Sequence, residues 1–272
     1  KASAEATLAD RIRMNKLALS FVMFSQGVPF FHAGDDILRS KSFDPNSYNS
    51  GDWFNKLDWT YESNNFGAGL PLEGSGQWGL YQPLLAQLEL APTKTDILSA
   101  SAVFNELLQI RKNSKLFRLE TADAIQRDLT FLNSGPEQIP GLIVMRLQDN
   151  SNLDPNYQEL IVLFNARPDA TSFNDTSLTG DYVLHPVQQN STDEVVKQAS
   201  FENNTFTVPG RTTAVFVIEK TQPVATETTV PATKPTTDTP ETAPNKSMTI
   251  AGIIAALLAL LGLGIFLRRK KA

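Results

Sequence analysis

The C-terminal end of the sequence carries a long run without a charged residue. Residues 248–267 read MTIAGIIAALLALLGLGIFL. A helix of about twenty residues, rising about 1.5 Å per residue, crosses a hydrocarbon core of roughly 30 Å. A helix buried in a globular domain carries a polar face, and this run has none. We therefore expect one transmembrane helix at 248–267.

The segments on either side of this run predict its orientation. The chain ends in RRKKA, residues 268–272, and cations next to a span mark its cytoplasmic side. Residues 221–247 are rich in Thr and Pro and nearly free of large apolar side chains, so we expect an extended, disordered linker. The pattern predicts a protein on the extracellular face of the cell membrane, held by a single C-terminal span with a short basic cytoplasmic tail.

Charge and cysteine content exclude several classes of function. The net charge is −5, and basic residues cluster only in the last five positions, which argues against a nucleic-acid partner. The chain has no cysteine, so disulfides, thiolate metal sites and cysteine nucleophiles are excluded. It begins at Lys1 without a signal peptide, and we expect it to be part of a longer chain.

The first 114 residues combine helical periodicity with one apolar run. Apolar residues recur at helical spacing in 7–26 and again in 96–112, where Thr95 or Asp96 is the expected N-cap. Between these helices, Val28–His32 is predicted to be a buried strand, and about sixty loop residues follow it. This order is typical of one unit of an α/β barrel or of a doubly wound sheet.

One histidine and four aspartates at or after the end of the predicted strand form the candidate site. In α/β folds the ligand site lies at the carboxyl ends of the strands. We therefore expect the side chains that follow Phe31 to lie in a loop over the ligand; they are His32, Asp35, Asp36, Asp44 and Asp52.

The sequence changes to period two after Lys115. Runs such as GLIVMRL and ELIVLFNA are separated by Gly, Pro, Asn and Asp, which predicts an antiparallel β-sandwich over 115–220. Pro209 and Gly210 are expected to turn a hairpin, and His185, which is expected to lie in a strand with no companion for imidazole chemistry, is expected to be structural.

The segment GVPFFHAGDDILRSKSFDPNSYNSGDWFNKLDW resembles the eighth-strand region of the α-amylase superfamily, glycoside hydrolase family 13. Its motifs FFHAG, LRSKS, SGDWFN and LDW are most similar to the pullulanase and limit-dextrinase branch. The resemblance implies that 1–114 is the C-terminal end of a (β/α)8 barrel, namely its last strand and flanking helices. Since so few elements cannot close a barrel, Phe21, Phe24, Phe30 and Leu107 are expected to expose apolar faces.

The resemblance also implies an activity. Enzymes of that family hydrolyse α-glucosidic bonds with retention, through an Asp nucleophile, a Glu acid/base and a second Asp. In the family these residues lie on earlier strands, the last of them in a His-Asp segment, and no His-Asp pair occurs here. We therefore expect the C-terminal part of a debranching enzyme for α-1,6 bonds in pullulan, glycogen or starch dextrins, with no catalytic residue in this chain and no activity of the chain alone.

Six residues are predicted to bind substrate: His32, Asp35, Asp44, Tyr48, Asp52 and Trp53. Carboxylates accept charge-assisted hydrogen bonds from sugar hydroxyls, and an exposed indole face suits the apolar face of a pyranose. Structural roles remain as alternatives. His32 could be a core histidine, Asp35 could cap a turn or pair with Arg39, and Asp52 could hold the loop in place. At least one of Trp53, Trp59 and Trp78 is expected to pack inside the loop.

The expected partners are an α-glucan polysaccharide or oligosaccharide and, through the C-terminal helix, the membrane. No cofactor is expected to be required, and whether Ca²⁺ binds stays open. The alternative function is a non-catalytic, membrane-tethered carbohydrate-binding or adhesion module. The residues encoded upstream of Lys1 distinguish the two.

Overall fold

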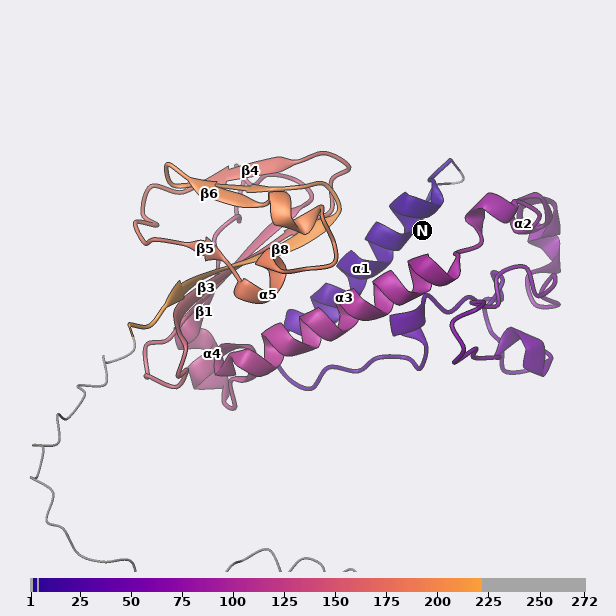
Figure 1. Ribbon diagram of the computed structural model, residues 1–272, viewed down its shortest axis with the longest axis horizontal. Coiled ribbons are helices and arrows are strands. Elements are labelled where there is room, and N and C mark those ends of the chain that lie inside the picture. Colours follow the sequence, from indigo (N-terminus) through magenta and orange to yellow (C-terminus); the bar gives the residue numbers. More distant parts are fainter. Residues whose placement is uncertain (1, 4, 222–272) are drawn as a thin grey trace, which may run out of the picture. The chain divides into compact units, whose positions relative to one another are not determined.

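The computed structural model describes residues 2–3 and 5–221, which belong to one compact unit (Figure 1). Within this part of the chain, no helix has both the length and the apolar character that a membrane crossing requires. The predicted span at 248–267, the basic tail at 268–272 and residues 222–247 of the predicted linker lie outside the described residues.

Two long helices, α1 (Leu8–Phe24) and α3 (Lys94–Asn113), lie side by side (Figure 1). Each begins with a Thr-x-x-Asp capping box, in which the threonine hydroxyl accepts from the aspartate N–H and the carboxylate accepts from the threonine N–H. Both predicted helices are therefore confirmed. The predicted cap of the second was wrong: Thr93 is its N-cap, because Asp96 lies at the third helical position and closes the box.

Two antiparallel sheets form the C-terminal half and confirm the predicted sandwich. The strand orders are β1-β2-β3-β8-β5 and β4-β7-β6. The strands of the larger sheet are β1 (Leu129–Phe131), β2 (Leu142–Gln148), β3 (Tyr157–Asn165), β8 (Thr212–Glu219) and β5 (Val183–Leu184). Those of the smaller sheet are β4 (Thr171–Asn174), β7 (Thr205–Val208) and β6 (Ser200–Glu202).

The central strands of the larger sheet are buried on both faces. In β3, Leu160 and Val162 face the core shared with the helices, whereas Ile161 and Leu163 face the core shared with the smaller sheet. The middle of β3 is covered on both sides, which explains the uninterrupted apolar run LIVLF at residues 160–164.

The helices and the sheet share one core. Phe24 and Leu107 are fully or almost fully buried in it, together with Phe164 and Val215 of the sheet. Phe21 stacks on Phe164 with ring centroids 4.4 Å apart. The expectation that Phe24 and Leu107 expose apolar faces was therefore wrong, because the larger sheet covers them. The boundary predicted at residue 114 remains a prediction. A smaller core of Ile37, Leu38, Ile97 and Ala100 lies on its N-terminal side, but α1 and α3 also share the larger core with the sheet.

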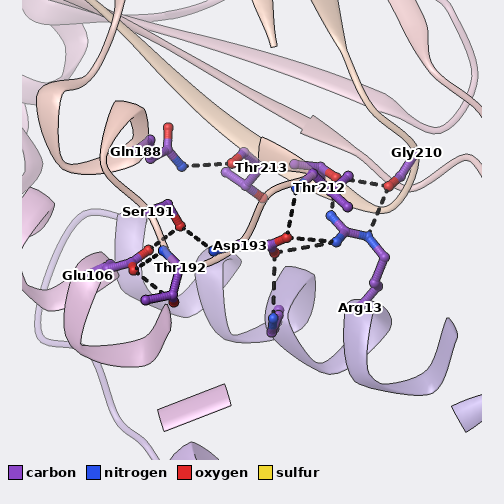
Figure 2. A network of polar contacts seen from close by, with 11 residues as sticks. Arg13, Glu106, Gln188, Ser191, Thr192, Asp193, Gly210, Thr212 and Thr213 are labelled. Carbon is purple, nitrogen blue, oxygen red and sulfur yellow. Dashed lines mark hydrogen bonds and ion pairs between the residues drawn. The ribbon is translucent and has the colours of Figure 1, made fainter. Parts of the chain in front are cut away.

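A polar network joins α1 and α3 to the sandwich (Figure 2). Arg13 of α1 donates to both carboxylate oxygens of Asp193, at 3.2 and 3.3 Å, and Lys16 lies 3.5 Å from the same carboxylate. Glu106 of α3 accepts from the Ser191 hydroxyl at 2.6 Å. Burial alone would raise the pKa of Asp193, but the charges of Lys16 and Arg13 outweigh it and hold that pKa below its usual value.

The predicted buried strand at Val28–His32 was wrong. This segment has no regular structure, and Val28 and Phe30 are 85% and 88% exposed. Only Phe31 packs inward, edge-on against Phe104 of α3. A parallel strand needs a neighbour for its N–H and C=O groups, and none of the strands within residues 2–3 and 5–221 pairs with this segment.

The segment between α1 and α3 contains one short helix and several single turns that were not predicted. Helix α2 (Trp78–Leu85) has Pro83 inside it, a residue that usually argues against a helix. The 3₁₀ turns of this segment are η1 (Asp35–Ile37), η2 (Asp52–Phe54), η3 (Ser75–Gln77) and η4 (Leu88–Leu90). The remaining short helices are η5 (Lys115–Arg118), α4 (Ala122–Asp128), α5 (Pro186–Gln189) and η6 (Val196–Gln198).

The turn assignments differ from the sequence expectation. Pro209 and Gly210 do not turn a hairpin, because β7 and β8 belong to different sheets. The hairpin lies instead at Asn203 and Asn204, between β6 and β7, and both residues have positive φ, as type I′ turns require.

Candidate functional site

Arg39 organises the first part of the long loop. One terminal guanidinium nitrogen donates to the Ala33 carbonyl at 3.0 Å and lies 3.4 Å from His32 Nδ1. The other donates to the Asn55 carbonyl. Arg39 thus ties the exposed His32 to the end of η2, and two segments more than twenty residues apart are fixed to each other.

Asp35 serves the turn that follows His32. Its carboxylate accepts from the His32 N–H at 2.9 Å, and its own N–H donates to the His32 carbonyl at 3.0 Å. Among the described residues, neither Asp35 nor Asp36 forms a salt bridge with Arg39. These two hydrogen bonds support the turn role of Asp35 rather than a pair with Arg39.

Asp52 and Trp53 are presented on the surface by η2. The indole of Trp53 lies against Gly51, where a Cβ atom would clash with the ring, and 58% of the residue is exposed. The Trp53 carbonyl accepts from the Asn65 side chain, which holds the turn from the other side. The exposed Asp52 carboxylate makes no hydrogen bond within the described part of the chain. An open carboxylate next to an open indole face is an arrangement that suits a sugar.

Asp44 and Tyr48 are placed differently from each other. Asp44 is only 8% exposed; its Oδ1 accepts from the Asn46 N–H at 3.1 Å, and its Oδ2 has no partner among the described residues. Tyr48 is 87% exposed. The Tyr48 side chain is therefore accessible to a ligand, whereas Asp44 is buried inside the loop.

Several residues that fix the loop were missed by sequence reasoning. Asn55 donates to the Ser47 carbonyl at 3.0 Å and accepts from the Ser47 hydroxyl at 2.9 Å. The Ser42 hydroxyl donates to the Asn65 carbonyl and accepts from the Ala68 N–H, each at 2.9 Å. The sequence could have indicated these residues, because Ser42 belongs to the motif LRSKS and Asn55 to the motif SGDWFN.

Asp58 builds the turn beside Trp59. Its carboxylate accepts from the hydroxyl and N–H of Thr60 and from those of Ser63. The hydrogen bonds from Thr60 and then Ser63 lower the pKa of Asp58 to about 2.

Two further tryptophans of the loop differ in exposure. Trp59, which follows Asp58, is 60% exposed, whereas Trp78 is half-buried and its indole N–H donates to the Pro71 carbonyl at 2.7 Å. Trp78 is thus the tryptophan that packs inside the loop.

The loop backbone is strained at several non-glycine positions. Positive φ values occur at Leu38 (57°), Ser42 (49°), Phe43 (66°), Tyr61 (62°) and Asn65 (69°). Such residues persist only where the surrounding contacts hold them, and they gather at ligand sites.

Within residues 2–3 and 5–221, no group of three or more His, Cys, Asp or Glu side chains is placed to hold a metal ion.

A family model described as alpha-1,6-glucosidases, pullulanase-type, C-terminal, matches residues 61–219. The chain belongs to this family. The resemblance inferred from the loop motifs is therefore confirmed by residues that lie mostly outside that loop.

Similar proteins carry the pullulanase name. Pullulanase 1, chloroplastic, of Arabidopsis thaliana is 48% identical over 80% of this chain and 24% of the relative. Pullulanase of Klebsiella pneumoniae is 34% identical over 79% of this chain and 20% of the relative. The chain thus spans about a quarter or less of the curated pullulanases that it matches.

Solved pullulanase structures share the fold. The crystal structure of PulA from Klebsiella oxytoca has a TM-score of 0.73 and 32% identity, over 84% of this chain and 23% of that one. The maltotriose complex of PulA from Klebsiella pneumoniae has a TM-score of 0.73 and 31% identity, over 82% of this chain and 25% of that one. The loop and the sandwich therefore belong to a pullulanase-type C-terminal arrangement.

Proposed function

We propose that this chain is the C-terminal part of a debranching glycoside hydrolase that cleaves α-1,6-glucosidic bonds in pullulan, glycogen or starch dextrins. The observation that carries the proposal is the family match over 61–219. The catalytic carboxylates lie upstream in the longer protein, and the reaction proceeds with retention through two carboxyl groups about 5 to 5.5 Å apart.

In this proposal, residues 1–114 are the end of the (β/α)8 barrel. The exposed side chains of Val28 and Phe30 support it, because an apolar segment between two helices is exposed when it is a barrel strand without its neighbours. Helices α1 and α3 are then barrel helices that also cover the sandwich.

The ligand of the loop is an α-glucan. Asp52 and Trp53 supply a carboxylate and an indole face next to each other, Tyr48 adds a second exposed ring, and Arg39 holds His32 nearby. Asp35 and Asp44 act by shaping the loop that carries them. The maltotriose complexes of similar pullulanases support an oligosaccharide as the ligand.

The proposed location is the extracellular face of the cell membrane. The sequence of 221–247, 248–267 and 268–272 supports it, as a linker, a span and a cytoplasmic tail. No cofactor is proposed for the chemistry. A chelator titration of the longer protein, followed by its activity on pullulan, measures whether it depends on calcium.

The test is a comparison of the 272-residue chain with the longer protein that contains it. The longer protein should release reducing sugar from pullulan, and the 272-residue chain should not. In the longer protein, Asp52→Ala should lower kcat/KM for pullulan while the unfolding temperature stays unchanged, because the carboxylate is exposed. Asp123→Ala on α4, another exposed carboxylate, is the control and should change neither. Turnover by the isolated chain, or a normal kcat/KM in Asp52→Ala, would contradict the proposal.

A further inference from the structure

A pocket lined by cations lies between η5, α4 and the loop that joins β2 to β3. Its volume is about 470 Å³. Lys115, Arg118 and Arg127 line it, and Glu120 is the one acid in the lining that the structure describes. The whole chain has a net charge of −5, so the lining differs in sign from the protein as a whole. None of these residues belongs to the segment between α1 and α3, which carries the candidate site.

Two of the three cations have no acidic partner within residues 2–3 and 5–221. The Lys115 ammonium makes no hydrogen bond or ion pair there, and Arg118 donates only to the Lys112 carbonyl, at 3.3 Å. Burial and then the charge of Arg118 lower the pKa of Arg111, so the cations of this region repel one another. An anion in the pocket would relieve this repulsion.

The third cation, Arg127, is held in place with one nitrogen free. Its Nε and one terminal nitrogen donate to the two carboxylate oxygens of the buried Asp128, at 2.9 and 2.7 Å. The other terminal nitrogen makes no hydrogen bond in the described part of the chain, and 44% of the side chain is exposed. Asp128 balances the charge of Arg127, but the free nitrogen can still donate to an oxyanion.

Buried acids tie the walls of the pocket together. The Asp154 carboxylate accepts from the Lys115 N–H at 2.8 Å, and the Asn150 amide donates to the Asp128 carboxylate at 3.1 Å. The loop between β2 and β3 is thus fixed both to η5 and to α4. A ligand would enter a pocket that is already formed, so little of its binding free energy would be lost in ordering the walls.

The charges and the volume together select the ligand class. A phosphate monoester carries a charge of about −1.5 to −2 and three acceptor oxygens, which suits two unpaired cations and a free guanidinium nitrogen. Pockets for small organic ligands have about 300 to 1,000 Å³, so there is room for more than the phosphate group. The hydroxyls of Thr121 and Ser151, beside Leu119 and Leu153, suit a small organic group that carries hydroxyls.

We propose that this pocket binds the phosphate monoester of a small polyhydroxyl compound, with the phosphate group between Lys115, Arg118 and Arg127. The Glu120 carboxylate shares the pocket with the phosphate and repels it, which limits the affinity. The inference goes beyond the proposed function and does not rest on it, because no residue of the pocket takes part in the loop site.

The experiment is a calorimetric titration of the 272-residue chain with ribose 5-phosphate, and inorganic phosphate and ribose are the comparison ligands. Ribose 5-phosphate should bind more tightly than inorganic phosphate, and ribose should not bind. Arg118→Gln should weaken the binding of ribose 5-phosphate about tenfold, and Glu120→Gln should strengthen it by a factor of about three. The matched control is Arg167→Gln, because Arg167 is also an exposed arginine whose side chain donates to one carbonyl, that of Pro140, at 3.3 Å.

Weaker binding in Arg118→Gln and tighter binding in Glu120→Gln, with Arg167→Gln unchanged, support the pocket. Equal weakening in Arg118→Gln and Arg167→Gln would mean that the ester binds to positive charge anywhere on the surface, which overturns the site. Equal affinities for ribose 5-phosphate and inorganic phosphate would leave the organic group without a role and overturn the assigned ligand class. No binding to the unmodified chain overturns the inference without any variant. Each of these failures leaves the proposed function intact, since turnover of pullulan by the longer protein is measured separately.

Discussion

Tyr157 Oη and His185 Nε2 lie 3.1 Å apart in the buried core between β3 and α5. The Val187 N–H donates to His185 Nδ1 at 3.1 Å, so Nδ1 is unprotonated and Nε2 carries the hydrogen that Tyr157 accepts. His185 is fully buried, and this burial lowers its pKa from 6.5 to about 4. The imidazole is thus a neutral structural group, as the sequence predicted.

Acid should therefore destabilise the chain through His185. The unfolded state takes up a proton near pH 6.5 and the folded state only near pH 4, so stability is full above pH 6.5 and falls as the pH drops through this window. The loss over the window is about 3 kcal/mol. Urea unfolding at several pH values should show the slope in the native chain and a much flatter one in His185→Gln. His32, the other histidine, is exposed, and His32→Gln should keep the full slope.

Asp193 should be essential for holding α1 to the sandwich. Asp193→Asn removes the partner of both Arg13 and Lys16 in a mostly buried site, and the expected cost is about 3 kcal/mol of unfolding free energy. The next residue provides the control: Glu194 forms an exposed pair with Lys197, and Glu194→Gln should cost no more than about 0.5 kcal/mol. Equal effects of the two substitutions on the urea midpoint would contradict the importance of the network.

Two phenylalanines should respond in opposite ways to truncation. Phe24→Ala opens the core shared with the sheet and should cost about 3 to 5 kcal/mol. Phe30→Ala removes a ring that is 88% exposed and should change the free energy of unfolding by less than about 0.5 kcal/mol. Thermal unfolding of the 272-residue chain checks both. A large loss in Phe30→Ala would mean that 28–32 is buried in solution after all.

Two tryptophans should separate binding from stability. Trp53→Ala removes an exposed indole face and should weaken maltotriose binding about tenfold with an unchanged unfolding midpoint. Trp78→Ala removes a half-buried ring and its bond to the Pro71 carbonyl, and should cost about 2 kcal/mol of stability. Calorimetric titration with maltotriose and urea unfolding measure the two effects. Unchanged maltotriose affinity in Trp53→Ala would remove this residue from the proposed subsite.

Local rules predicted the helices and the main strands well. The spacing of apolar residues located α1 and α3, because a helix that packs on one side must repeat its contacts every three or four residues. The runs GLIVMRL and ELIVLFNA became β2 and β3. The strand at 28–32 failed because strand formation depends on a neighbour, and apolar composition cannot say whether one is present.

The site was predicted less completely than the fold. The motifs directed attention to Asp52 and Trp53, which the structure exposes together. They did not reveal that Asp44 is buried, nor that Arg39 and Asn55 hold the loop, because these facts depend on contacts between segments far apart in sequence. The short helix α2 was missed because Pro83 and its eight-residue length both argue against a helix.

The core shared by α1, α3 and the larger sheet has a consequence for exchanging parts between relatives. A chimera that replaces 115–220 alone would set foreign strands against the side chains of Phe24 and Leu107, and every mismatch there would be a hole or a clash. An exchange between relatives that preserves this core therefore keeps α1, α3 and the sandwich together, and a crossover between helix and sandwich should be tolerated poorly.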